Sequence, residues 1–130
     1  MDEAIRSYFE DLRGYINRHF NNVQVVRYSS SNERTLLDVY CSFRSYRIRI
    51  FELIDEIGRS YAYYVFQNDE VIAGFDNAPD GVALRQRYGR EFSRHRQERI
   101  PHFHGRGKHI LSLADEINCE EFLNWLKQLD

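Results

Sequence analysis

Between positions 46 and 50 large apolar and charged side chains alternate one for one. Tyr46, Ile48 and Ile50 alternate with Arg47 and Arg49. Successive side chains of a β-strand point to opposite faces of the sheet, so this order predicts a strand with one buried face and one wet face. The fold must therefore contain a sheet that other elements cover on one side.

Four further segments have the β-branched and aromatic composition of strands and are separated by turn residues. They span 23–28, 36–42, 61–67 and 71–75. Asn68 and Asp69 predict a hairpin turn between the last two segments. A further short strand is expected at 109–113. We expect about five main strands in a largely antiparallel sheet.

Amphipathic patterns at the two ends predict helices. Apolar residues recur at helical spacing through 3–20, and Asn118 with Glu121 forms a capping-box pattern before a final helix. The predicted fold class is α+β, a single largely antiparallel sheet packed against N- and C-terminal helices. The residues expected to be buried there are Ile48, Ile50, Tyr63, Val65 and Trp125.

The length and composition favour one domain spanning 1–130. The 130 residues are 42% hydrophobic and include nine Tyr and nine Phe, which is enough to build one core. No apolar run reaches the length of a membrane helix, and no signal peptide is evident. Cys41 and Cys119 form no Cys-x-x-Cys pair, which indicates a reducing compartment, with a lone disulfide left open. We expect a cytoplasmic protein without a membrane partner.

The net charge of −2 conceals a strongly basic segment. Residues 85–108 carry +6, which leaves −8 on the rest of the chain. This segment belongs to a basic helix and loop inserted at about 80–108, although Gly89 weakens the helical pattern. Such asymmetry favours a polyanion, while a solvated helix face or a site for an acidic protein stays open. The predicted nucleic-acid-binding residues are Arg85, Arg87, Arg90, Arg94, Arg96 and Arg99.

Three histidines follow within eight positions, interleaved with cations. They are His102, His104 and His109, accompanied by Arg106 and Lys108. Histidine exchanges protons near neutral pH, and a nearby cation can stabilise a phosphorane, so this cluster suits metal-free attack of a ribose 2′-hydroxyl on its phosphodiester. The glycines predict a loop over 101–108. A metal site with His109 as third ligand and a plain anion-binding loop are the alternatives, and we favour chemistry with neither metal nor cofactor.

Asp76 and Asn77 stand at the end of the predicted strand 71–75, just before Pro79. Asp and Asn in this position commonly shape a turn through side-chain hydrogen bonds to the backbone. They could instead orient a histidine or an arginine. Both interpretations stay open from the sequence.

Several of these segments, taken in order, resemble the TumE-type toxins. They are Tyr46 to Ile50, Tyr61 to Gln67, Phe75-Asp76-Asn77-Ala78-Pro79 and Pro101-His102-Phe103-His104. The resemblance covers about 36–129. This chain departs from the family pattern in having Asp80 where members tend to have His, in the basic insertion, and in Phe103 between the two histidines.

The resemblance implies the toxin of a toxin–antitoxin pair, encoded beside a helix-turn-helix antitoxin. Combined with the histidine cluster, it leads us to expect a metal-independent endoribonuclease. Its partners would be the cognate antitoxin and RNA, with a second copy of the chain as a further candidate. The competing hypothesis is a non-catalytic regulatory or defence-accessory module that binds nucleic acid or protein through the same basic surface.

Overall fold

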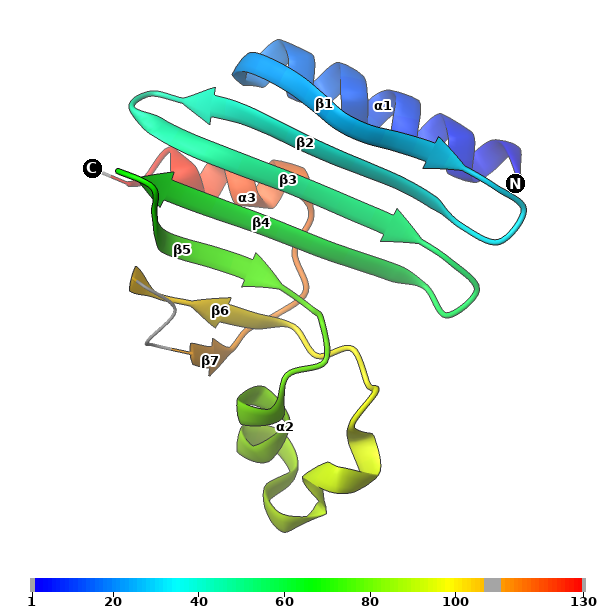
Figure 1. The fold of residues 1–130 in the computed structure, drawn as a ribbon, viewed down its shortest axis with the longest axis vertical. Coiled ribbons are helices and arrows are strands. Elements are labelled where there is room, and N and C mark those ends of the chain that lie inside the picture. The colour runs from blue at the N-terminus through cyan, green and yellow to red at the C-terminus, as the bar shows by residue number, and fades with distance from the viewer. Residues whose placement is uncertain (1, 107–110, 130) are drawn as a thin grey trace.

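A computed structural model of the chain describes residues 2–106 and 111–129 (Figure 1). In chain order its elements are α1 (Glu3–His19), β1 (Asn21–Ser30), β2 (Thr35–Phe43), β3 (Tyr46–Ile54), β4 (Arg59–Gln67), β5 (Glu70–Asp76), α2 (Gly81–Tyr88), the 3₁₀-helix η1 (Gly89–His95), β6 (His102–His104), β7 (Leu111–Leu113) and α3 (Cys119–Leu126).

The strands form one sheet in the order β1-β2-β3-β4-β5-β6-β7, and every neighbouring pair is antiparallel. In Figure 1 α1 and α3 both lie behind this sheet, whereas no helix lies in front of β2, β3 and β4. We call the front side the open face. The α+β prediction is confirmed, although the described sheet has seven strands rather than about five.

The core lies between the sheet and the two helices. Ile48, Ile50, Tyr63 and Val65 are 0% exposed, which confirms the predicted buried face of β3 and β4. Trp125 is half-buried and contacts the ring of Phe75 edge-on at 5.1 Å between centroids. The helices add the apolar side chains of Phe9, Leu12, Ile16, Phe122, Leu123 and Leu126. Cys41 and Cys119 are buried free thiols.

One carboxylate is fully buried on the helix-covered side and is satisfied there. Glu52 accepts hydrogen bonds from Arg59 Nε at 2.9 Å, from the Tyr63 hydroxyl at 2.6 Å and from the Tyr8 hydroxyl of α1. Arg59 also donates to the Ile117 carbonyl at 3.0 Å, just before α3. A charge removed from water needs such partners, so this network ties both helices to the sheet.

The capping signals in the sequence are present in the structure. Asn118 accepts from the Glu121 N–H at 2.8 Å, and the Glu121 carboxylate accepts from the Asn118 N–H at 3.0 Å. Asn68 and Asp69 adopt positive φ values of 52° and 61° in the predicted hairpin turn between β4 and β5. These local features were predictable because each depends on only a few consecutive residues.

The predicted basic helix is present, but it is short. Asp80 caps α2 by accepting the Ala83 N–H at 3.0 Å, and Gly89, at φ 57°, ends the helix. The chain continues as η1 and returns to the sheet. We call residues 81–99 the basic lobe, which projects from the lower end of the sheet in Figure 1. Its small apolar cluster consists of Ala83, Leu84 and Ile100, with Tyr88, Phe92 and Leu111 packed against them.

The predicted loop over 101–108 is wrong at its start, because His102–His104 forms β6. This strand pairs with β5 on one side and β7 on the other. Its three residues are too few to show strand periodicity by themselves. Gly105 and Gly107 also favoured a loop, whereas pairing with the end of β5 decides the conformation.

Candidate functional site

The register between β5 and β6 brings the predicted polar residues together. Asp76 lies opposite His102, and Gly74 lies opposite His104. Phe103 points to the other side of the sheet, where its ring lies 4.9 Å from Phe75 between centroids. Because side chains alternate along a strand, this anchoring in the core directs both histidines to the open-face side.

His102 is held at both ring nitrogens. Its Nε2 lies 3.0 Å from Asp76 Oδ1, and its Nδ1 lies 2.6 Å from the Ile100 carbonyl oxygen. Burial alone would lower the pKa of His102, but the bonds to the carboxylate and the carbonyl outweigh burial and raise the pKa above its usual value. Both partners are acceptors, so the imidazolium form fits this position best.

Asp76 is the centre of the cluster. Its Oδ1 also accepts the Ala78 N–H at 3.0 Å, while its Oδ2 accepts the Tyr64 hydroxyl and lies 3.4 Å from His104 Nε2. Burial acts to raise the pKa of Asp76, but the hydrogen bonds from His102 and Tyr64 outweigh it and hold the pKa below its usual value. Asp76 therefore both shapes the turn and orients a histidine, the two roles left open by the sequence.

Tyr64 was not singled out by sequence reasoning. Its ring is stacked beside His104, 6.0 Å between centroids, and a Cβ at Gly74 would overlap that ring. Burial, and then the Asp76 carboxylate, raise the pKa of Tyr64 far above its usual value, so the hydroxyl keeps its proton. The alternation along β4 places Tyr64 on the open-face side, but only the register shows that it meets Asp76.

Arg49 is a second residue that the sequence did not mark as functional. It lies directly opposite Tyr64 in the β3–β4 register. Its guanidinium binds Asp38 through two hydrogen bonds of 3.0 and 3.1 Å, which orient it on the open face. The site thus has a cation on the strand next to Tyr64.

Asp76, His102 and His104 could also hold a divalent transition metal. One ligand atom from each residue lies within 4.8 Å of the others. His102 Nε2 lies 3.0 Å from Asp76 Oδ1 and His104 Nε2 lies 3.4 Å from Asp76 Oδ2, so each histidine is near a different oxygen of the same carboxylate. The Ile100 carbonyl gives His102 the outer hydrogen bond that metal-binding histidines usually have. Among the described residues Asp76 is the third candidate ligand, and His109, which the sequence offered as a third ligand, lies outside them.

The other residues predicted for the site are distributed differently. Asn77 is buried and bridges the β4 backbone, accepting the Tyr61 N–H at 2.9 Å and donating to the Arg59 carbonyl at 2.9 Å. Arg106 is exposed. Lys108 and His109 lie outside the described residues.

The arginines of the basic lobe divide into two groups. Arg85 stacks on Phe92 at 4.4 Å, Arg94 pairs with Glu91 at 2.9 Å, and Arg99 pairs with Asp55 at 2.7 Å. These contacts engage part of the positive charge within the protein. Five of the six predicted arginines are exposed, Arg99 being the partly buried one, and the exposed residues outside these contacts are Arg87, Arg90 and Arg96.

Three comparisons with known proteins found no relative from which a function could be inferred. No family model, no curated protein and no solved structure matches the chain. Among the described residues, no helix is long and apolar enough to cross a membrane. Function is therefore inferred from chemistry and geometry.

Proposed function

We propose that this chain is the toxin of a toxin–antitoxin pair and that it cleaves RNA in the cytoplasm without a metal ion. The main support is the convergence of His104, Tyr64 and Asp76 on the open-face side of the sheet, where His102 also binds the Asp76 carboxylate. Cleavage of a phosphodiester needs a group that can take up and give back a proton, and a histidine oriented by a carboxylate can do both near neutral pH.

The proposed reaction is internal transesterification. The ribose 2′-oxygen bonds to the adjacent phosphorus as its proton passes to the enzyme, and the bond from phosphorus to the 5′-oxygen breaks. That oxygen takes up a proton and leaves as a 5′-hydroxyl, while the other product ends in a 2′,3′-cyclic phosphate. No oxidant, reductant or water is consumed in this step.

The residues take distinct roles in this proposal. His104 exchanges the proton with the substrate. Tyr64, which gives its hydroxyl proton to Asp76, holds that carboxylate in place and packs its ring beside His104. Arg49, which lies opposite Tyr64 in the register and whose charge acts on the Tyr64 hydroxyl, is the cation that we assign to the phosphorane. Asp76 and His102 are positioning residues, since both nitrogens of the buried His102 are already engaged.

Two other functions compete with this one. Metal-dependent phosphodiester hydrolysis is favoured by the metal-compatible geometry of Asp76, His102 and His104. A non-catalytic binding module would use the same basic lobe without cleaving anything. Product formation in chelator identifies the metal-free nuclease. Cleavage that needs an added divalent metal identifies the metal-dependent enzyme, and binding without cleavage in either condition identifies the binding module.

The biochemical test is cleavage of single-stranded RNA in excess chelator. Wild-type protein should yield 2′,3′-cyclic phosphate and 5′-hydroxyl ends, identified by mass spectrometry. His104→Ala should reduce the rate by about 10²–10⁴-fold, the usual contribution of a positioned acid or base. His19→Ala is the matched control, because His19 lies in the last turn of α1, outside the Asp76 cluster. Activity that appears only on adding Zn²⁺ or Mn²⁺ would favour the metal-dependent alternative.

The biological test is growth arrest. Expression of the wild-type chain alone should stop growth, co-expression of an adjacent helix-turn-helix gene should restore it, and His104→Ala should be harmless at equal protein level. Arrest by His104→Ala as strong as by wild type would reject this site as the source of toxicity.

A further inference from the structure

A single row of cross-strand partners leads across the open face to the proposed site. Each residue of the row lies directly opposite the next on the neighbouring strand, and opposite residues project from the same face of a sheet. From β1 to β6 the row consists of Gln24, Tyr40, Arg49, Tyr64, Gly74 and His104.

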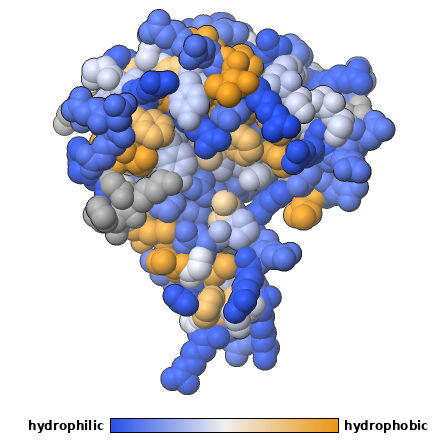
Figure 2. Space-filling view, viewed as in Figure 1, coloured by the Kyte–Doolittle hydropathy of each residue, from blue (hydrophilic) through white to orange (hydrophobic). Residues whose placement is uncertain are grey.

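Aromatic rings and guanidinium groups alternate along and beside this row. Arg47 lies over the Tyr40 ring at 5.3 Å, and Phe66 lies 6.5 Å from the Tyr64 ring between centroids. Rings provide surfaces for base stacking, and guanidinium groups contact phosphates, so this combination fits a single-stranded nucleic acid. In Figure 2, which looks onto the open face, hydrophilic and hydrophobic residues are interspersed rather than gathered into one apolar patch.

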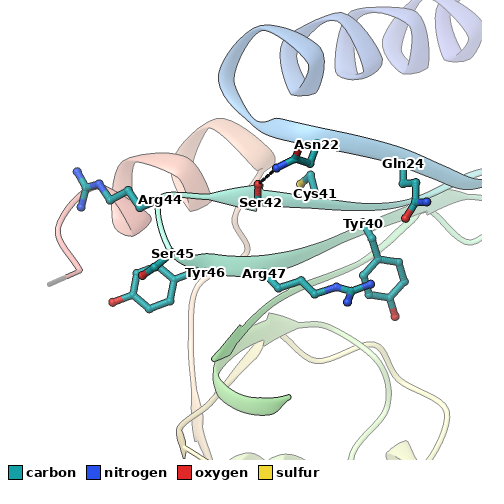
Figure 3. Close-up of a pocket in the computed structure, with 9 residues that line it drawn as sticks. All are labelled: Asn22, Gln24, Tyr40, Cys41, Ser42, Arg44, Ser45, Tyr46 and Arg47. Carbon is teal, nitrogen blue, oxygen red and sulfur yellow. Dashed lines mark hydrogen bonds between the residues drawn. The ribbon is translucent and has the colours of Figure 1, made fainter. Parts of the chain in front are cut away.

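The far end of the row borders a hollow of about 480 Å³. Figure 3 shows Tyr40 and Arg47 together at one side of it, with Gln24 beside Tyr40 and with Asn22 bound to Ser42 at 2.9 Å. Amide and hydroxyl groups can hydrogen-bond the edges of a base, and the Tyr40 ring can stack on its face. Tyr40 and Arg47 also line a second hollow of about 250 Å³ with Phe66.

We propose that single-stranded RNA crosses the open face along this row, with one base beside Tyr40 and the phosphate to be cleaved at Tyr64 and His104. This path rests on the proposed ribonuclease function and names how its substrate is held. From β2 to β6 the row spans four strand spacings of roughly 4.8 Å, about 19 Å, which suits a few extended nucleotides. The basic lobe then adds electrostatic attraction beyond the site. Arg94 and Arg99 contribute less to it, because each is already paired with a carboxylate of the protein.

Binding can be measured apart from cleavage with a fluorescent 2′-O-methyl RNA oligonucleotide, which lacks the attacking hydroxyl. In fluorescence anisotropy, Tyr40→Ala should raise the Kd by about 5- to 150-fold, the usual loss for one stacked base. Tyr40→Phe should keep binding near the wild-type level, because it retains the ring. Arg47→Gln should also weaken binding.

Matched controls come from the helix-covered side. Tyr15→Ala and Arg6→Gln change the same residue types on α1 and should leave the Kd unchanged. Circular dichroism and thermal unfolding verify that each variant is folded. Wild-type affinity in Tyr40→Ala and Arg47→Gln would overturn the path. Tight, Tyr40-dependent binding without cleavage of ordinary RNA would support the path while contradicting the proposed function.

Discussion

Gly74 is the residue that gives Tyr64 its place beside His104. The Tyr64 ring lies where a side chain at position 74 would be, so the absence of a Cβ lets the phenol reach the Asp76 carboxylate. Glycine at position 74 is thus needed both for the close packing of the Tyr64 ring on the β5 backbone and for the geometry of the candidate site.

Gly74→Ala should therefore destabilise the protein by about 1–3 kcal/mol, the usual effect of overpacking, and should displace Tyr64. Chemical unfolding measures the first effect, and loss of the Tyr64–Asp76 hydrogen bond in a structure of the variant measures the second. Gly81→Ala is the control, because a Cβ there meets nothing within 4 Å. Equal stability of the two variants would contradict the steric role of Gly74.

For single residues, the sequence alone predicted part of the candidate site. The histidine cluster marked His102 and His104, and the position at a strand end marked Asp76. Tyr64 and Arg49 could not be found this way, because their place in the site depends on register between strands that are far apart in sequence. Asn77 was expected to orient catalytic groups, whereas its amide is used by the β4 backbone.

Among the elements, those with strong local signals were predicted and those that depend on pairing were not. The periodicity of α1, the alternation in β3 and the capping box of α3 are each contained in one segment. Three-residue β6 is a strand only because β5 and β7 lie on either side of it. The histidines therefore lie in regular structure rather than in the predicted loop.

An ion pair between the basic lobe and the sheet should have an effect on stability that depends on pH. Arg99 binds Asp55, near the β3–β4 turn, and holds the pKa of that carboxyl below its usual value. A lowered pKa means that the pair stabilises the fold above the unfolded-state value near 4 and loses this contribution as pH falls further.

Arg99→Gln should accordingly lower the free energy of unfolding by about 1 kcal/mol at pH 7, and this difference from wild type should shrink below about pH 4. Urea unfolding across this range tests the expectation. Arg94→Gln, which breaks an exposed pair on the same lobe, should change stability little at any pH. If Arg99→Gln remained less stable than wild type in acid, its lower free energy of unfolding would come from lost packing and not from the lost ion pair.

At the scale of the whole molecule, the contrast between a basic segment and an acidic remainder predicts where a nucleic acid would bind and how its affinity would depend on salt. The overall charge is −2, yet 85–108 carries +6, so attraction should be local and sensitive to salt. Replacing Arg90 and Arg96 by Gln should reduce the log–log slope of affinity against salt by about 1.4 if both contact phosphates of a single strand.

The control for this titration is the double change Arg6→Gln and Arg18→Gln on α1, which alters net charge by the same amount. The salt slope of this control should match that of wild type. The loss of affinity caused by replacing Arg90 and Arg96 should be similar for unrelated RNA sequences. Affinity that ignores salt would indicate that the lobe serves a protein partner.

The strictly sequential order of the sheet also has a consequence for biosynthesis. Each strand pairs with the one made just before it, so the sheet can grow by adding hairpins as the chain leaves the ribosome. Asp76 and Tyr64 are in place early, but His102 and His104 arrive only after the basic lobe has been synthesised. A chain ending before residue 102 would lack both histidines as well as the α3 side chains that complete the core, so the core and the candidate site are completed together, at the end of synthesis.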